Sequence, residues 1–559
     1  MVSLLVLIFA AALSAQEVAP AQAQPAQPQA EKPKADCVVK GQILNAITGE
    51  PLKKARVNLM KPDARTGPRE RDVDATGRFE FRGVEPGRYT LSAERTGFVS
   101  QSYGTRKPGT NLGGTTITLA PAQEMKDLVI KLSPQAVIVG RVLDEDGEPM
   151  AGAQISAMRS MWQGKKRQLM PAGSANSNDL GEYRVYGLAP DSYLMQATRP
   201  NYFNGMPPSP EPPSDKPEEG YIATWYPGTA DSSTSPRVTV KGGSELRGVD
   251  IRMVKSRVVR IRGKIVSASS GKPTSGNVML MPRNKGYTSW MEMKHSFVQD
   301  PTIGFEFRDV TPGSYQLRAQ IGMNDENETI LQTIDVSDSN IENLILRPTP
   351  GTEIRGKVTV EGGKIEGERV NISVGPWDDD GGANFAGGWA QAKDDGTFTI
   401  KSVQAGRYRV QCYRQDSYVK SVRAGDQDIT DTPLDTSQGG PASLDIVLSL
   451  KVPEVSGSVK NADGKPVTGA FVVLIPKDET RLGRWESYGT STTDQYGNFR
   501  VRSIRPGDYK ALAVEEMEGG EFMDPEFIKP IEDKAVSVSL QEGVKENLQL
   551  TLASDKKQE

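Results

Sequence analysis

The chain has 559 residues, which is enough for three to five domains of ordinary size. Hydrophobic residues make up 36% and charged residues 25%, as in soluble globular domains, and abundant glycine (56) and proline (38) favour short strands joined by turns. Lysine and arginine number 68 against 71 aspartates and glutamates. The resulting net charge of −3 excludes the strongly basic surface expected of a protein that binds nucleic acid or anionic membranes.

The first residues predict export. An apolar run, Leu4–Leu13, is followed by small residues, which is typical of a signal peptide over residues 1–15, although no lysine or arginine precedes the run. The alternative is a buried first strand. The run is too short to span a bilayer and no later segment comes closer, so we expect a soluble mature chain without a transmembrane segment. Residues 16–35 are rich in Ala, Pro and Gln and predict a disordered linker.

One signature recurs five times, and its first copy, residues 74–93, reads DATGRFEFRGVEPGRYTLSA. Asp and Gly supply a turn, alternating phenylalanines share one face of a strand, and Pro-Gly makes the next turn into a strand whose tyrosine faces inward. The signature therefore predicts a β-hairpin half buried against a second sheet. The turn aspartates are Asp74, Asp179, Asp300, Asp394 and Asp494; the tyrosines, expected to be buried at equivalent positions, are Tyr89, Tyr193, Tyr315, Tyr408 and Tyr509.

Further strands flank each hairpin. A Gly-x-Val (or Gly-x-Ile) strand and a turn precede it, as in Gly41–Pro51, and an alternating strand such as Leu128–Leu132 closes each copy. About seven short strands per copy, no convincing helical periodicity and a spacing of roughly 100 residues predict an all-β chain of about five β-sandwich domains. The expected domains are residues 36–134, 135–256, 257–349, 350–450 and 451–555, the fourth being divergent. Five sandwiches in a row are expected to form a rod.

These motifs resemble the carboxypeptidase regulatory-like domain family, whose fold is a transthyretin-like (prealbumin-like) β-sandwich related to Ig-like sandwiches. The resemblance covers nearly all of the chain from about residue 37 to 555 and rests on the G-x-V strand, the D-G-x-P turn and the D-x-x-G-x-F-x-F hairpin. It implies a secreted, periplasmic or cell-surface bacterial protein that binds or scaffolds without catalysis. Two other roles stay open: carbohydrate binding, and an accessory role to a peptidase or an outer-membrane transport system.

Catalytic and metal chemistry have little support. His295 is the single histidine, so a zinc carboxypeptidase site, which needs two histidines and a glutamate, cannot be assembled. The chain has no G-x-S-x-G elbow, phosphate loop or C-x-x-C pair. We expect no catalytic residue, cofactor or metal ion, and interpret His295 as an exposed loop residue. The run Asp378–Asp380 suggests a solvated acidic turn, because no calcium-ligand spacing accompanies it.

The two cysteines are Cys37 and Cys412. A disulfide between them is possible in an oxidising compartment but has no positional support. Cys412 alternates with Tyr408 and Val410 at a position where the other copies have alanine. This alternation predicts a small core residue.

The tryptophans carry the most suggestive functional signal. Trp162, Trp290, Trp377 and Trp485 precede the hairpins of copies two to five, Trp389 lies in the same segment of copy four, and Trp225-Tyr226 lies in a Pro/Gly-rich loop. Indole faces in loops bind sugar rings in many modules, whereas the alternative is that each indole covers the end of its own sandwich. If the chain has a ligand, we expect a polysaccharide or another cell-envelope component bound through Trp225, Tyr226, Trp377 and Trp485.

Overall fold

The computed structural model describes most of the chain after the linker. The described residues are 36–62, 67–109, 114–163, 166–199, 218–267, 270–283, 293–321, 328–347, 351–365, 367–377, 387–440 and 443–553. The predicted signal peptide, the linker, Trp290 and the run Asp378–Asp380 lie outside these residues.

Each repeat contributes an outer sheet built around its Gly-x-Val strand. This strand pairs antiparallel with the first strand of the hairpin and parallel with the closing strand. In repeat order the outer sheets are β4(Arg78–Val84)–β1(Cys37–Asn45)–β8(Glu124–Leu132); β12(Glu182–Leu188)–β9(Ala136–Leu143) with β17(Glu245–Leu246) and β18(Ile251–Arg252); β22(Phe305–Val310)–β19(Lys255–Ile265)–β25(Ile341–Leu346); β29(Thr397–Val403)–β26(Thr352–Glu361)–β34(Leu444–Ser449)–β31(Tyr418–Ala424)–β32(Gln427–Asp428); and β38(Asn498–Val501)–β35(Glu454–Lys460)–β41(Lys545–Ala553).

Each repeat also contributes an inner sheet that contains the tyrosine strand of the hairpin. In repeat five the end of this strand also pairs parallel with β41, which joins the inner and outer sheets into one. In repeat order these sheets are β3(Arg69–Asp72)–β2(Arg56–Met60)–β5(Gly87–Glu94) with β6(Gln101–Ser102) and β7(Ile117–Leu119); β11(Lys166–Asn176)–β10(Gln154–Gln163)–β13(Asp191–Thr198) with β15(Thr224–Trp225) and β16(Val238–Val240); β21(Lys294–Val298)–β20(Gly276–Pro282)–β23(Gly313–Ile321)–β24(Glu328–Val336); β28(Gly388–Gln391)–β27(Asn371–Pro376)–β30(Arg407–Tyr413)–β33(Leu434–Asp435); and β37(Gly489–Thr492)–β36(Phe471–Pro476)–β39(Gly507–Val514)–β40(Val536–Leu540).

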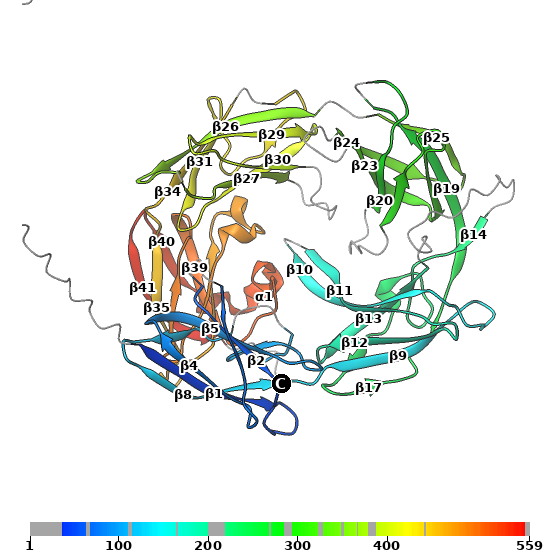
Figure 1. Ribbon diagram of the computed structural model, residues 1–559. Helices are drawn as coiled ribbons and strands as arrows, with labels where there is room; N and C mark the ends of the chain where they lie inside the picture. The colour runs from blue at the N-terminus through cyan, green and yellow to red at the C-terminus, as the bar shows by residue number, and fades with distance from the viewer. Residues whose placement is uncertain are drawn as a thin grey trace, which may run out of the picture.

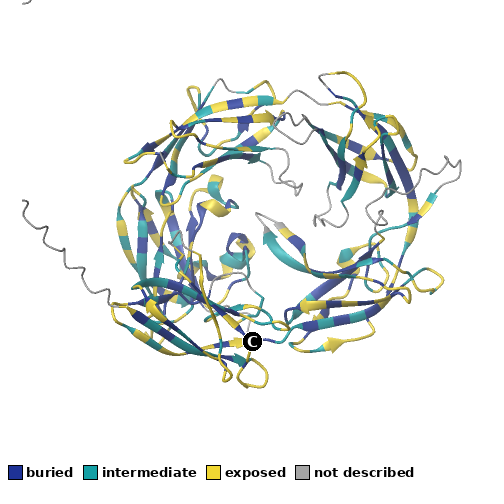
Figure 2. Cartoon of the chain, in the orientation of Figure 1, coloured by how far each residue is buried: buried dark blue, intermediate teal, exposed yellow. Residues whose placement is uncertain are grey.

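A hydrophobic core fills each sandwich, so the all-β prediction is confirmed. Five clusters of buried residues extend over residues 37–132, 136–253, 259–346, 354–448 and 455–550, and Figure 2 shows buried positions alternating with exposed ones along the strands. One strand pairs with a repeat other than the one to which its sequence position assigns it. β14(Glu218–Tyr221), in the segment expected to belong to repeat two, pairs with β19 at the edge of the third outer sheet.

The glycine of each Gly-x-Val strand is required by close packing. At Gly41 a Cβ atom would lie 2.2 Å from the Leu128 carbonyl oxygen and 2.6 Å from the Phe79 ring, so the aromatic side chain of the hairpin needs a bare backbone beneath it. The equivalent glycines are Gly140, Gly263, Gly356 and Gly457, where the nearest carbonyl oxygen would lie 1.9–2.4 Å away. The glycine of the signature is therefore explained by close packing of the central strand against the closing strand and the hairpin.

The five tyrosines are buried at equivalent positions, as predicted. Their exposed fractions are 5% (Tyr89), 1% (Tyr193), 6% (Tyr315), 2% (Tyr408) and 1% (Tyr509). Each hydroxyl donates a hydrogen bond of 2.8–2.9 Å to the carbonyl oxygen four residues upstream. Each ring therefore fills the core while its hydroxyl fixes the turn that leads into its own strand.

Side-chain oxygens cap the first turn of each hairpin, although not always from the expected residue. Asp74, Asp300 and Asp494 accept a hydrogen bond from the backbone N–H two residues on. In repeats two and four, Asp179 and Asp394 were the wrong choices, because Asn178 and Asp395 make this bond. The geometry requires an oxygen two residues before the N–H that it caps, and amide and carboxylate oxygens serve equally well.

Repeat five carries a helical segment that the sequence analysis missed. It comprises η5(Glu521–Met523), α1(Pro525–Ile528) and η6(Lys529–Lys534), and it packs on the side of the inner sheet that faces away from the sandwich core. As a result, all six residues of β36 are buried. A continuous apolar run such as Phe471–Pro476 is the sequence signal for a strand covered on both faces. Among the described residues, the other short helices are η1(Ser232–Thr234), η3(Glu479–Arg481) and η4(Trp485–Ser487).

The expected rod is wrong, because the sandwiches follow one another around a ring. Figure 1 shows the inner sheets turned towards the middle of the ring and the first repeat beside the fifth. Contacts at the junctions set the bends: Arg159 donates to the Gly109 carbonyl oxygen at 3.1 Å, and Lys255, the first residue of β19 in the third outer sheet, pairs with Glu145 of repeat two. The repeat pattern is local to each domain and therefore contains no information about these angles.

Candidate functional site

The predicted ligand-binding aromatics occupy very different environments. Trp225 is only 4% exposed and packs against Met158, Leu169 and Leu194 on the second face of the inner sheet of repeat two. Tyr226 is partly buried against the core of that repeat. The expectation that Trp225 offers its face to a sugar is therefore wrong in this structure. Its indole covers a small apolar cluster formed by distant strands.

Trp377 and Trp485 lie at the junction of repeats four and five. Trp377 directly follows β27, and the guanidinium groups of Arg409 and Arg484 lie 5.7 and 4.3 Å from its ring centre. Trp485 begins η4 and is 71% exposed. A guanidinium over an indole is a favourable electrostatic contact, so Trp377 is held in place within the protein whereas Trp485 remains open to solvent.

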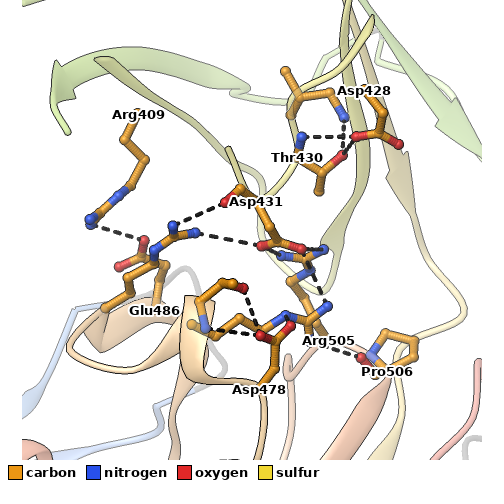
Figure 3. Close-up of polar contacts among 12 residues, drawn as sticks. Arg409, Asp428, Thr430, Asp431, Asp478, Glu486, Arg505 and Pro506 are labelled. Atoms are coloured by element: carbon orange, nitrogen blue, oxygen red, sulfur yellow. Dashed lines mark hydrogen bonds and ion pairs between the residues drawn. The ribbon is translucent and has the colours of Figure 1, made fainter. Parts of the chain in front are cut away.

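Three arginines of repeat five converge on Asp431 of repeat four (Figure 3). Arg505 makes two hydrogen bonds to the Asp431 carboxylate, at 2.8 and 3.3 Å, and both Arg481 and Arg484 approach it at 3.5 Å. Arg484 also donates to the Asp431 carbonyl oxygen at 3.2 Å. Such a network fixes one sandwich against the next.

The remaining charges at this junction are paired as well. Arg409 of β30 reaches Glu486 at 3.4 Å, and Asp478 holds Arg481 at 3.4 Å. Burial, together with the nearby charge of Arg409, lowers the pKa of the Arg484 guanidinium. The junction gathers positive groups around indoles, but each of these arginines has a carboxylate partner within 3.5 Å.

Trp389 is an exposed aromatic that the sequence analysis did not include among the ligand residues. It lies on β28 at the edge of the inner sheet of repeat four and is 75% exposed. Tyr413 at the end of β30 is 69% exposed. Both residues alternate with core residues along their strands, so their side chains point away from the core. This alternation is the sequence signal that could have identified them as exposed.

The single histidine and the two cysteines, which are the residue types with reactive side chains considered above, occupy structural positions. His295 lies on β21 rather than in a loop, opposite Met279, and its pKa is lowered by burial. Cys37 and Cys412 form no disulfide with each other; Cys37 is buried and donates to the Ala120 carbonyl oxygen at 3.0 Å. Cys412 packs against the core of repeat four, where burial raises its pKa to about 12.

Two features are absent from the part of the chain that the structure describes. Across the described ranges, no cluster of three or more histidine, cysteine, aspartate or glutamate side chains is arranged to hold a metal ion. In the same part of the chain, no helix has the length and apolar character needed to cross a bilayer.

The family comparison matches the first repeat. Residues 38–133 fit the model of the carboxypeptidase regulatory-like domain. The match begins one residue after the start of β1 and ends one residue after the end of β8, so the family resemblance inferred from the repeat is confirmed there. A comparison with curated protein sequences gave no match.

Solved structures with weak likeness to the chain include bacterial pilins. The Bacillus anthracis TIE protein has 11% identity and a TM-score of 0.16, covering 56% of this chain and 51% of its own, so the chain spans about half its length. The minor pilin GBS52 of Streptococcus agalactiae has 13% identity and a TM-score of 0.22, with coverages of 39% and 96%. The major pilin subunit BcpA of Bacillus cereus has 10% identity and a TM-score of 0.14, with coverages of 56% and 100%. Likenesses this weak carry no conclusion about function.

Proposed function

We propose that the protein is a non-catalytic binding scaffold, exported to the periplasm or cell surface, whose five regulatory-like sandwiches are held as a closed ring. The observation that carries this proposal is the interface between the first and fifth repeats, which lie at opposite ends of the described chain. The apolar run at residues 1–15 supports export. The five separate cores support domain boundaries at residues 36–134, 135–256, 257–349, 350–450 and 451–555.

The interface joins β7 of repeat one to the hairpin turn of repeat five. Thr118 donates through its backbone N–H to the Gln495 side chain at 3.0 Å and through its hydroxyl to Asp494 at 2.9 Å. Gln495 donates back to the Thr118 carbonyl oxygen at 2.6 Å, and Thr492 donates to the Gly114 carbonyl oxygen at 2.8 Å. The side-chain amide of Gln495 thus bonds both backbone groups of Thr118, as the backbone of a neighbouring strand does at the edge of a sheet.

The connection between β39 and the helical segment of repeat five reinforces the closure. Glu515 pairs with Arg106 and Glu518 pairs with Lys107, both in repeat one. Gly520, in the left-handed conformation, lies against the β10 strand of repeat two, where a Cβ atom would be 2.4 Å from the Trp162 carbonyl oxygen. Repeat five therefore contacts two earlier repeats through one segment. Such a ring holds the inner sheets in fixed mutual positions, which suits a scaffold.

Small-angle X-ray scattering of a charge-insertion variant tests the ring. Thr118→Arg places a long side chain between β7 and the Asp494 turn, so we expect the ring to open and the radius of gyration to rise. The matched control is Thr359→Arg, an exposed position on the outer sheet of repeat four. An unchanged scattering curve for Thr118→Arg, or equal changes in both variants, would contradict the closed ring.

A further inference from the structure

The inner sheet of repeat four differs from those of repeats two and five in what covers the face turned away from the sandwich core. In repeat five the central strand presents Phe471, Val473 and Ile475 on this face, and the helical segment buries them. In repeat two the same face is covered by Trp225 over Met158 and Leu194. Both repeats thus cover an apolar face with apolar side chains of their own.

In repeat four the equivalent positions are polar. The central strand β27 carries Asn371, Ser373 and Gly375, one hundred positions before the apolar residues of repeat five. An apolar cover like that of repeat five would leave the amide of Asn371 without hydrogen-bond partners, which costs free energy. The occupant of this face must itself carry hydrogen-bonding groups.

Two rows of side chains cross this face. In the first row, Ser373 lies between Trp389 of β28 and Gln411 of β30. In the second row, Asn371 lies between Gln391 and Tyr413. The residues of both rows share one face because their positions along each strand differ by two. Ser373 and Gln411 are 3.5 Å apart and hydrogen bonded.

The rows form a flat platform with an exposed aromatic at two diagonal corners. Trp389 and Tyr413 are 75% and 69% exposed. With ordinary strand and residue spacings, their positions lie about 12 Å apart across the sheet. Four neutral polar side chains make up the rest of the two rows, and neither row contains a carboxylate or a cation. The rows on either side carry charge: Arg409 on one side is paired with Glu486, and Arg369 and Lys393 lie two residues beyond Asn371 and Gln391 on the other.

We infer that this face, defined by Trp389, Tyr413, Asn371, Ser373, Gln391 and Gln411, binds a neutral oligosaccharide chain. The C–H faces of sugar rings stack on exposed indole and phenol rings, while hydroxyl groups exchange hydrogen bonds with amides and a hydroxyl. Two aromatics about 12 Å apart suit a chain of several sugar units rather than one. The inference rests on the binding role proposed above and names the ligand class and the surface.

Isothermal titration of the full chain tests the inference with four separate probes: maltohexaose, cellohexaose, xylohexaose and chitohexaose. We expect at least one to bind, and Trp389→Ala and Tyr413→Ala each to weaken binding at least about tenfold, as loss of an anchoring aromatic does. Tyr186→Ala is the matched control, because Tyr186 is 65% exposed on the outer strand β12 and should leave binding unchanged.

Three results would overturn the inference. One is the absence of binding by all four probes up to about 10 mM, beyond the range of useful protein–ligand affinities. Another is unaltered binding by both platform variants. The third is loss of binding in Trp485→Ala alone, which would place the ligand on the exposed loop indole instead. Small-angle scattering from the same samples tests the ring independently. If the ring is closed but no oligosaccharide binds, only the oligosaccharide inference fails and the ring proposal stands.

Discussion

Replacing Tyr509 measures how much the recurrent core tyrosine stabilises a sandwich. The ring is 1% exposed in the core of repeat five, and its hydroxyl donates to the Arg505 carbonyl oxygen at 2.8 Å. Tyr509→Phe removes only this bond and leaves the carbonyl oxygen without that donor, so we expect a loss of about 1–2 kcal/mol. Tyr509→Ala also removes a buried aromatic ring, so the loss should reach about 3–5 kcal/mol.

Residues 451–555, which contain the complete fifth core and its helical segment, provide the system for this measurement. We expect this fragment to fold alone and to unfold in one cooperative transition, followed by far-ultraviolet circular dichroism during urea titration. For a domain of this size each kcal/mol corresponds to about 4–8 °C in Tm. Tyr509→Phe should therefore melt several degrees below the wild type, and Tyr509→Ala much lower still.

The two variants separate the hydroxyl from the ring. Equal stability of Tyr509→Phe and wild type would show that the bond to Arg505 contributes nothing. A loss below about 1 kcal/mol in Tyr509→Ala would refute the reasoning altogether, because core truncation of an aromatic ring costs more than that. A fragment without any cooperative transition would instead contradict the proposed domain boundary.

Three further predictions concern other parts of the chain. Gly457→Ala should destabilise repeat five strongly in thermal unfolding, since its Cβ atom would lie 1.9 Å from the Leu548 carbonyl oxygen; Gly375→Ala, with no atom within 4 Å, is the control and should be nearly neutral. Hydrogen bonds from Lys255 and Tyr221 lower the pKa of Glu145 from 4.5 to about 2, so the stability that this carboxylate contributes is present above pH 4.5 and is lost as the pH falls towards 2. Hydrogen exchange at the junction of repeats two and three, followed as the pH is lowered, measures this loss. The exchange rate of Glu145→Gln should depend less on pH than that of the wild type, and an unchanged pH profile would contradict the prediction. N-terminal sequencing of exported protein should find the chain cleaved near residue 15, whereas an intact Met1 would exclude the signal peptide.

The sequence by itself determined the local architecture of each sandwich. The glycine of the Gly-x-Val strand, the alternating phenylalanines and the closing tyrosine all lie where the pattern placed them, because period-two alternation states directly which side chains face a core. Turn chemistry was also readable, and the errors at Asp179 and Asp394 were shifts of one residue between neighbouring oxygen-bearing side chains.

Only the tertiary structure decided how the sandwiches are arranged and which aromatics are free. Trp225 lies in a loop by sequence, yet it is buried because Met158, Leu169 and Leu194 from distant strands meet it. The ring depends on contacts such as Thr118 with Asp494, which are separated by most of the chain. Alternation within a strand shows which side chains share a face. It does not show which segment, if any, covers the face that is turned away from the core. In repeat five that cover comes from the helical segment and in repeat two from Trp225 of β15, whereas in repeat four Trp389 and Tyr413 remain exposed.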